Sequence, residues 1–332
     1  MYTYADIRHV HLEVSTLCNA KCPLCPRNVC GYDYNLGYPE VNLTLKDAET
    51  IFTTDFLKQL NYININGNFG DAVMNPEVPE IIKYFKNVNP NLIISLCTNG
   101  GARNSNWWLE LAKTNTTVIF DLDGLEDTHS LYRQNTLFKT VLKNAKTFID
   151  AGGIAEWKFI VFDHNRHQIE QCRQLSKQLG FKTFDTVDHG RDTTAVYNNS
   201  GNLSHLIGNP TDVQETVFEQ LNNAIAWKEK PSNYISYANE TDNIKCKVTD
   251  NKSVYISANG DVYPCCWTGN YPKTYKLTGN TQIKELANNN NALDVGIKNA
   301  IHWFDSVKQS WDKNTYKEGR LFICNNECGG CN

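Results

Sequence analysis

Residues 13–27 read EVSTLCNAKCPLCPR and contain three closely spaced cysteines. Cys18, Cys22 and Cys25 form a CxxxCxxC pattern directly after an expected strand. Three thiolates on one short loop can bind three irons of a cubane [4Fe–4S] cluster and leave the fourth iron open. A catalytic metal needs such an open position, whereas a structural site is normally closed. A zinc knuckle that takes Cys30 as its fourth ligand is the alternative interpretation of this loop.

The chain around this loop alternates between strands and helices over its first 190 residues. Strands are expected at Ile7–Val14, Tyr62–Asn66, Leu92–Cys97, Thr117–Asp121, Trp157–Phe162 and Lys182–Val187. Helices are expected at Leu45–Leu60, Pro79–Lys86, Ser105–Lys113, Leu137–Ala151 and Gln168–Leu179. Thr44 and Asp47 predict a capping box at the first helix, and Gly152-Gly153 and Gly180 end two later ones. This α/β alternation predicts a parallel sheet, open or curled into a partial barrel, that binds ligands at the carboxyl ends of its strands.

Composition excludes several classes of protein. The chain has 332 residues, of which 41% are hydrophobic and 20% charged, with a net charge of −4. These values exclude a wholly disordered chain and the basic footprint of a dedicated nucleic-acid binder. No apolar run approaches the roughly 20 residues of a membrane span, and the N-terminus lacks the pattern of a secretory signal. We therefore expect a cytoplasmic protein of about two domains, or of one large α/β domain with an appendage, without a nucleic-acid or membrane partner.

The cysteines fall into groups, which in a reducing compartment indicate metal sites rather than disulfides. One group lies in the N-terminal loop; the others are Cys246, Cys265 and Cys266, and Cys324, Cys328 and Cys331. Cys97 and Cys172 stand apart, and we expect both to pack in the interior. His9 and His11 alternate along the first strand, and we expect structural roles for them.

The character of the chain changes after residue 190. Residues 191–245 form a polar connecting segment with one helix expected near Thr211–Lys228. Val254–Ser257 and Asp261–Tyr263 flank an Asn-Gly turn and predict a hairpin. Helical signals return near Leu293–Trp311. The predicted division is a barrel over 1–190, the connecting segment, and a small α+β domain over 246–332.

The N-terminal cysteine loop resembles the cluster motif of the radical S-adenosylmethionine (SAM) superfamily. Leu24 departs from the motif, since the family often has an aromatic residue there. The resemblance implies that the open iron chelates SAM, and that one electron cleaves it to methionine and a 5′-deoxyadenosyl radical that abstracts hydrogen from a substrate. It also implies a partial (β/α)6 TIM-like barrel and a reductant such as flavodoxin or ferredoxin.

Later strand ends resemble the SAM-binding motifs of this family. Residues 70–72 read GDA where the family has a Gly-Glu-Pro turn, residues 98–100 read TNG, and residues 121–124 read DLDG. Residues 129–133 match an H-x-x-x-R pattern, whose Arg fork suits the SAM carboxylate. The fifth strand would supply apolar contacts to adenine. The residues implied to contact SAM are Asn68, Asp71, Thr98, Asp121, Arg133 and Val161.

The later cysteines resemble a SPASM/Twitch auxiliary-cluster domain. Thirteen residues separate Cys246 from Gly260 and four more precede Cys265, which matches Cx9–15Gx4C. Cys328 and Cys331 supply the closing CxxC of the Twitch pattern. The resemblance thus implies one auxiliary [4Fe–4S] cluster on these four cysteines, with Cys266 and Cys324 as spares. A structural zinc on the same four thiolates is the alternative.

Three functions stay open at this point. The first is a radical SAM enzyme that modifies a peptide or protein side chain, which rests on analogy and on the long polar segment as a binding surface. The second is a Twitch-type dehydrogenase of a small alcohol or carbohydrate. The third is a non-catalytic zinc or iron–sulfur scaffold, against which Asp71, Asp121 and Arg133 at strand ends argue.

Overall fold

A parallel sheet forms the centre of the molecule. The computed structural model describes residues 1–25, 27–28, 30–31, 39–188, 194–198, 200–207, 243–270 and 279–329, so Cys331 and the helix expected near residues 211–228 lie outside the described residues. The strand order is β10-β9-β1-β2-β3-β4-β5-β6, and β1 to β6 pair in parallel. The six strands are β1 (His9–Leu12), β2 (Tyr62–Ile65), β3 (Ile93–Thr98), β4 (Thr117–Asp121), β5 (Ile154–Val161) and β6 (Thr183–Asp188). The expected α/β partial barrel is therefore confirmed.

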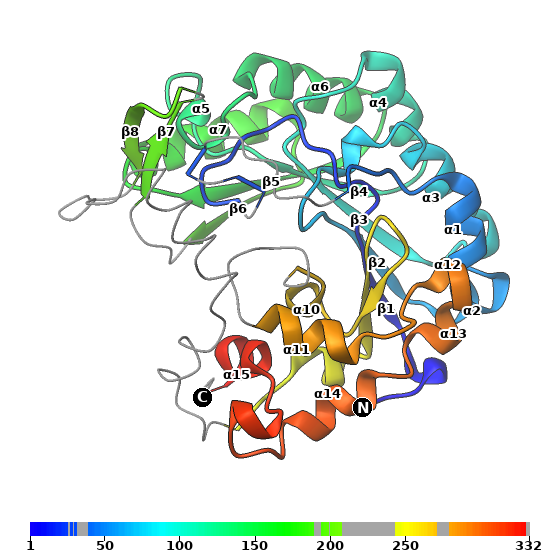
Figure 1. Cartoon of the computed structure of the whole chain (residues 1–332). Helices are drawn as coiled ribbons and strands as arrows, with labels where there is room; N and C mark the ends of the chain where they lie inside the picture. The colour runs from blue at the N-terminus through cyan, green and yellow to red at the C-terminus, as the bar shows by residue number, and fades with distance from the viewer. Residues whose placement is uncertain are drawn as a thin grey trace.

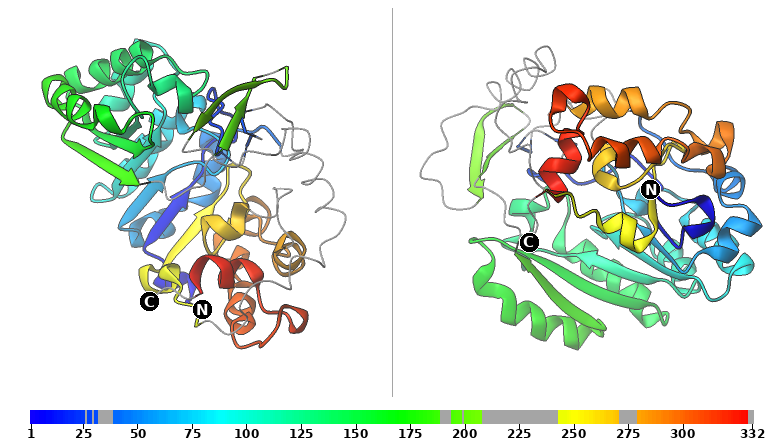
Figure 2. Two further views of the ribbon diagram at one scale, coloured as in Figure 1. Left: turned by 90° about the vertical axis from the view of Figure 1, so that its left-hand side faces the viewer. Right: turned by 90° about the horizontal axis from the view of Figure 1, so that it is seen from below.

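Helices cover the outer face of this sheet (Figures 1 and 2). They are α1 (Leu45–Ile51), α2 (Thr54–Gln59), α3 (Val78–Val88), α4 (Ser105–Ala112), α6 (Phe138–Asp150) and α7 (Ile169–Leu179). The Thr44–Asp47 capping box is present at α1. The single helix expected over 45–60 is wrong, because Phe52 leaves the helical conformation and Thr53 caps a second helix.

Large aromatic side chains fill the space between helices and sheet. Trp108 of α4, Phe120 of β4 and Trp157 of β5 are fully buried. The rings of Trp108 and Phe120 lie 5.4 Å apart. Truncating such a side chain costs about 3–5 kcal/mol, so this core holds the strand ends rigidly in place.

A hairpin from the C-terminal part of the chain extends the same sheet. Strand β9 (Ser253–Ile256) pairs in parallel with β1, so that Val10 lies opposite Val254, and β10 (Val262–Tyr263) pairs antiparallel with β9. The hairpin is present as expected, but it adds to the barrel sheet instead of standing apart from it. The boundary at residue 246 stays a prediction.

Short helices follow this hairpin and gather beside it, below the sheet in Figure 1. They are α10 (Cys266–Asn270), α11 (Gly279–Leu286), α12 (Ala292–Val295), α13 (Ile297–Ala300), α14 (Phe304–Ser310) and α15 (Phe322–Cys328); α9 (Lys247–Asn251) precedes the hairpin. The helical signals expected near Leu293–Trp311 correspond to three helices, α12, α13 and α14. Gly296, with φ of +74°, ends α12 and starts α13.

A second, two-stranded sheet packs on the N-terminal cysteine loop. It consists of β7 (Thr194–Tyr197) and β8 (Leu203–Ile207), paired antiparallel. Val196 and Ile207 pack with Cys22 in a cluster separate from the main core. The amide of Tyr197 donates to the carbonyl of Cys30 at 2.9 Å. Part of the connecting segment thus covers the loop, which the sequence did not predict.

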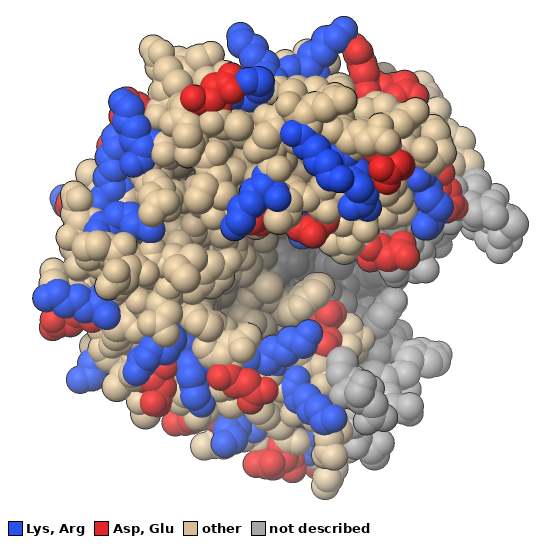
Figure 3. Space-filling model, turned by 180° about the vertical axis from the view of Figure 1, so that it is seen from behind, with Lys and Arg blue, Asp and Glu red and all other residues tan. Residues whose placement is uncertain are grey.

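The surface of the molecule mixes both signs of charge and contains a hollow. Figure 3 shows Lys and Arg interspersed with Asp and Glu over the described residues of that face, and a hollow between the upper and lower parts of the molecule in this view. Among the described residues, no helix has both the length and the apolar composition that crossing a membrane requires.

Candidate functional site

A cavity of about 360 Å³ opens at the carboxyl ends of β1 to β4. The loop after β1 contributes all three of its motif cysteines, and the loop after β2 contributes residues 66–71. The other lining residues are Cys97, Thr98 and Asn99 on β3 and just after it, Asp121 on β4, Tyr132 and Arg133 near α5 (His129–Tyr132), Ala20, Leu24, His11, Cys266 and Trp267. Parallel strands meet at one edge of a sheet, which is why motifs far apart in the sequence come together here.

Nitrogen donors point at two of the three cysteine sulfurs. The amide of Ala20 donates to Cys18 Sγ at 3.4 Å, and Asn99 Nδ2 lies 3.8 Å from the same sulfur. Arg133 Nη1 lies 3.9 Å from Cys22 Sγ. Such donors stabilise a thiolate, the form that binds metal. The donor set therefore fits a thiolate-ligated cluster.

Burial works against ionisation of the same thiols. It raises the pKa of Cys22 to about 12 and the pKa of Cys18 well above its ordinary value, and neighbouring Arg133 opposes the shift at Cys22. A metal must therefore displace the protons, which couples binding to pH. Among the described residues, no three Cys, His, Asp or Glu side chains surround a single-ion position. A cubane does not require this, because each of its cysteines binds a different iron.

Asp71 ties the loop after β2 to the end of β3. Its carboxylate accepts hydrogen bonds from Thr98 Oγ1 at 2.6 Å, from the Asn99 amide at 2.7 Å and from the Val73 amide at 3.1 Å. Burial raises the pKa of Asp71, and these hydrogen bonds oppose the rise. The structure thus brings the side chains of Asp71 and Thr98 together through a hydrogen bond.

Gly70 lets the loop after β2 press on the cysteine loop. A Cβ atom at this position would lie 1.9 Å from the carbonyl oxygen of Ser15 and 2.7 Å from that of Leu17. The Asp71 amide donates to the same Leu17 carbonyl at 2.8 Å. Backbone of the two loops is therefore in direct contact, and only glycine fits.

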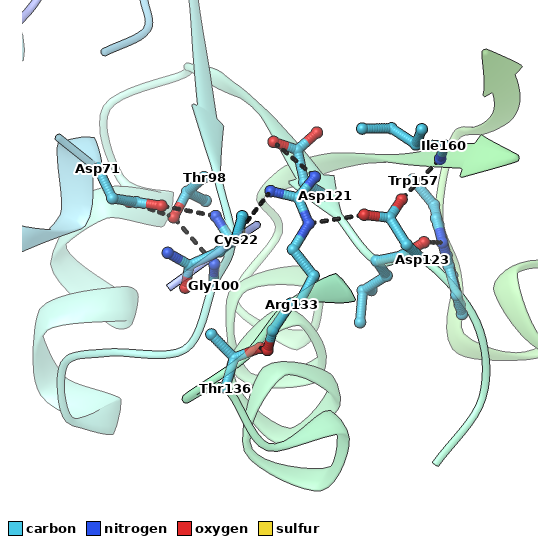
Figure 4. Close-up of polar contacts among 12 residues, drawn as sticks. Cys22, Asp71, Thr98, Gly100, Asp121, Asp123, Arg133, Thr136, Trp157 and Ile160 are labelled. Carbon is cyan, nitrogen blue, oxygen red and sulfur yellow. Dashed lines mark hydrogen bonds and ion pairs between the residues drawn. The ribbon is translucent and has the colours of Figure 1, made fainter. Parts of the chain in front are cut away.

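Arg133 lies between two carboxylates beside Cys22 (Figure 4). Its Nε donates to Asp123 Oδ2 at 2.6 Å, and its Nη2 lies 3.6 Å from Asp121 Oδ2. Burial alone would lower the pKa of Arg133, but Asp123 and Asp121 raise it well above its ordinary value. The guanidinium is thus a fixed cation at the cavity wall.

Asp123 is a site residue that sequence reasoning missed. It is fully buried, and its Oδ1 accepts the Ile160 amide at 2.6 Å while Oδ2 holds Arg133. The DLDG motif contains both carboxylates, so the sequence did hold a signal for Asp123 beside Asp121. Asp121 is the one that lines the cavity; burial raises its pKa, and Arg133 opposes the rise.

The structure gives two other predicted residues unexpected surroundings. Val161 packs in the main hydrophobic core, while its neighbour Ile160 packs against the cysteine-loop cluster. Successive side chains of a strand face opposite sides, so the strand directs Ile160, and not Val161, toward the site. Asn68 lines the cavity, and its Nδ2 donates to the carbonyl of Cys266 at 2.8 Å. It thereby connects the barrel to α10.

Three more residues lie near the cavity, although the sequence motifs did not assign them to it. Buried Glu13 accepts the amides of Phe69 at 2.7 Å and Gly70 at 3.2 Å. His11 and Cys97 line the cavity. Cys97 lies on a barrel strand as expected, and it also lines the cavity. The burial pattern of their strands indicates this position, because His11 and Cys97 each lie between two buried neighbours.

The later cysteines gather near α15. The Lys245 amide donates to the Cys328 carbonyl at 3.1 Å, and Ile244 forms an isolated antiparallel bridge with Gly329. These contacts bring Cys246 to the end of α15. Cys265 ends the segment that enters α10, which packs against α15. Cys266, expected as a spare, lines the cavity instead.

Comparisons with known proteins support this fold. No family model matches the chain. It is 31% identical over 117 residues to the FeMo cofactor biosynthesis protein NifB of Methanocaldococcus jannaschii and 32% identical over 114 residues to that of Methanocaldococcus infernus. These matches cover 34% and 33% of this chain. They span 38% and 37% of the length of the two relatives, which is well under half of each.

Two solved structures share the arrangement of strands and helices. One is native anSMEcpe with bound AdoMet, with a TM-score of 0.50, 17% identity and coverage of 77% of this chain and 74% of that one. The other is Streptococcus suis SuiB bound to precursor peptide SuiA, with a TM-score of 0.50, 15% identity and coverage of 89% and 66%. At such identities the likeness is one of fold. The chain therefore has the partial-barrel fold of radical SAM enzymes.

Proposed function

We propose that the chain is a radical SAM enzyme that binds a [4Fe–4S] cluster through Cys18, Cys22 and Cys25. The observation that carries this proposal is one cavity lined by all three cysteines, with N–H donors aimed at the sulfurs of Cys18 and Cys22. When bound, the cluster supplies the electron that cleaves SAM to a 5′-deoxyadenosyl radical. A cavity of about 360 Å³ lies within the range of small-molecule sites, roughly 300–1,000 Å³.

The chain's own residues would bind and orient SAM in this cavity. Arg133 has a guanidinium edge at the cavity wall beside Cys22, suited to the SAM carboxylate. Asp71 already accepts three hydrogen bonds. A carboxylate offers about four acceptor positions, so Asp71 can accept one bond from the SAM ammonium. Asp121 is partly exposed beside Arg133 and is our candidate for the ribose hydroxyls. Ile160, instead of Val161, is the candidate of β5 for adenine.

The remaining wall of the cavity is our candidate substrate side. His11, Cys97, Cys266 and Trp267 line it. His11 Nε2 lies 2.7 Å from the Asn66 carbonyl oxygen, which can only accept, so this nitrogen carries the proton. Burial lowers the pKa of His11. The ring is therefore neutral at pH 7, with Nδ1 as an acceptor.

A second cluster is proposed for the later cysteines. The resemblance assigns it to Cys246, Cys265, Cys328 and Cys331, of which the last lies outside the described residues. A structural zinc is the competing occupant. Iron, sulfide and zinc analysis after anaerobic purification separates the two: we expect about eight irons per chain for two cubanes, and stoichiometric zinc with about four irons would favour the alternative.

The proposed substrate is a peptide or protein side chain. Support comes from the fold likeness to SuiB, whose structure contains the precursor peptide SuiA. The second candidate is a small alcohol or carbohydrate that loses two hydrogens. Reduced enzyme and SAM are incubated with separated peptide and metabolite fractions of the source cell. Substrate-dependent 5′-deoxyadenosine with a mass change on a polypeptide supports the first candidate, and formation with the metabolite fraction alone contradicts it.

The decisive test of the enzyme proposal is SAM cleavage. Dithionite-reduced, reconstituted protein should convert SAM to 5′-deoxyadenosine, and replacing Cys18, Cys22 and Cys25 together with Ala should abolish the conversion. Cys30→Ser is the matched control, because it removes a cysteine of the same loop that only the zinc-knuckle interpretation requires. SAM cleavage that persists in the triple variant would contradict the assignment of the three cysteines to the cluster. Absence of cleavage in the wild type would favour a scaffold.

A further inference from the structure

Cys324 lies on the same helix face as Cys328, a proposed ligand of the second cluster. The two cysteines are four residues apart on α15, and side chains at this spacing share a face of a helix. The backbone contacts at Lys245 and Ile244 place Cys246 at the end of this helix. Cysteines from three separate chain segments therefore meet at α15.

Cys324 is buried within electrostatic range of other thiols. It is 9% exposed, and it interacts electrostatically with the thiols of Cys265, Cys246 and Cys328. Cys265 in turn interacts with Cys246. A cysteine that merely packs differs from this: Cys172 on α7 is fully buried, and its charged neighbours are carboxylates.

An indole nitrogen beside Cys324 lacks an acceptor. Trp311 Nε1 is buried and has no hydrogen-bond partner among the described residues. Burial raises the pKa of the Cys324 thiol, whereas the Trp311 indole lowers it, so the N–H and the sulfur are neighbours. An indole nitrogen can only donate, and a metal-bound thiolate is a stronger acceptor than a neutral thiol. A sulfur bound to iron at this position would give the Trp311 N–H an acceptor.

We propose that Cys324 is a ligand of the second cluster, together with Cys246, Cys265 and Cys328, and that Trp311 Nε1 donates a hydrogen bond to its sulfur. This rests on the proposed second cluster but changes the ligand set that the Twitch motif implies, in which Cys324 is a spare. Hydrogen bonds to cluster sulfurs help to set the reduction potential. Trp311 would thus adjust the potential of the cluster without binding iron.

The test uses the full chain with Cys18, Cys22 and Cys25 replaced by Ala, so that only the second site can bind iron. After anaerobic reconstitution this background should hold about four irons per chain. Adding Cys324→Ala should remove most of this iron and the visible thiolate-to-iron absorption. Adding Cys266→Ala, the matched control, should leave both unchanged. Circular dichroism and thermal melting without iron check that each variant folds.

Several outcomes overturn the proposal. These are full iron content with an unchanged spectrum in the Cys324→Ala chain, or zinc in place of iron in the background. A background that binds no metal overturns it too. SAM cleavage by protein with an intact N-terminal loop is measured separately, so failure of the enzyme proposal is distinguishable from failure of this one.

A second variant tests the hydrogen bond alone. Trp311→Phe keeps an aromatic ring but removes the N–H, so the four irons should remain. The reduction potential of the second cluster, measured by a redox titration followed by EPR, should become more negative, because a donor to sulfur favours the reduced and more negative cluster. Full iron with an unchanged potential would remove Trp311 from the proposal.

Discussion

The Tyr255 hydroxyl donates a 2.7 Å hydrogen bond to Glu13 Oε2, although the two residues are 242 positions apart. The other carboxylate oxygen of Glu13 accepts the amides of Phe69 and Gly70. One buried side chain thus joins the strand before the cysteine loop, the loop after β2 and the C-terminal hairpin. The arrangement of the cavity depends on this junction.

Removing the Tyr255 hydroxyl should destabilise the protein. Tyr255→Phe leaves the ring in place but takes a donor from a buried carboxylate, and we expect a loss of about 1–3 kcal/mol in the free energy of unfolding. Urea denaturation measures it. Tyr84→Phe is the control: its hydroxyl donates to the Phe52 carbonyl at the half-buried surface, and its loss should cost about 0.5–1.5 kcal/mol. Equal costs would mean that the Glu13 bond has no special weight.

Replacing Arg133 should weaken SAM binding. Arg133→Lys keeps the charge but loses the planar fork that contacts Asp123 and Asp121, so SAM affinity should fall roughly tenfold, about 1.4 kcal/mol. Equilibrium binding to reconstituted protein measures this. Arg173 of α7 packs as a cation over the ring of Phe184 on β6, and Arg173→Lys should leave SAM affinity unaltered. Unchanged affinity in Arg133→Lys would assign the SAM carboxylate to another group.

A methyl group at position 70 should disturb the N-terminal cluster. Gly70→Ala places Cβ against the Ser15 carbonyl, so the cysteine loop must move, and the iron bound there should be lost while iron at the second site stays. Gly152→Ala is the control, because no atom lies within 4 Å of its added Cβ; its φ of +87° costs only about 1–2 kcal/mol. Normal iron content in the Gly70→Ala chain would show that the loops can separate without loss of the site.

Acid should destabilise the protein through His129. Burial lowers the pKa of His129 from 6.5 to about 3, so the unfolded chain binds a proton below pH 6.5 that the folded chain excludes. Its contribution to stability is therefore lost as pH falls from 6.5 toward 3, with a slope of at most about 1.4 kcal/mol per pH unit. Denaturation of metal-free protein at pH 7, 6 and 5 measures the slope, and His129→Gln should reduce it. The same slope in both proteins would assign the acid sensitivity elsewhere, such as to His11, whose pKa burial also lowers.

Patterns of residues close together in the sequence predicted the elements that depend on contacts within a few positions. The strand over Thr117–Asp121, the capping box at Thr44 and the left-handed end of α7 at Gly180 all depend on contacts within a few positions. The cavity was also predictable in outline, because motifs at the ends of consecutive parallel strands must meet. Asp71 and Arg133 line it together for this reason.

Contacts between distant segments escaped the sequence. Glu13 looks like an ordinary polar residue until the fold brings it its donors. The pairing of β9 with β1 has no local signature, since a hairpin reads the same whether it stands alone or joins a sheet. The packing of β7 and β8 on the cysteine loop depends on Val196 and Ile207 in the same way.

The position of β1 between β2 and β9 also governs how the protein can be made. Synthesis proceeds from the N-terminus, so β1 and the cysteine loop leave the ribosome long before Val254 exists to pair with Val10. Until then one edge of β1 has unpaired amides and carbonyls, and such edges invite aggregation. Contacts so far apart in the sequence also slow folding. The open edge of β1 is therefore covered only after residue 254 has been synthesised, long after the cysteine loop has left the ribosome.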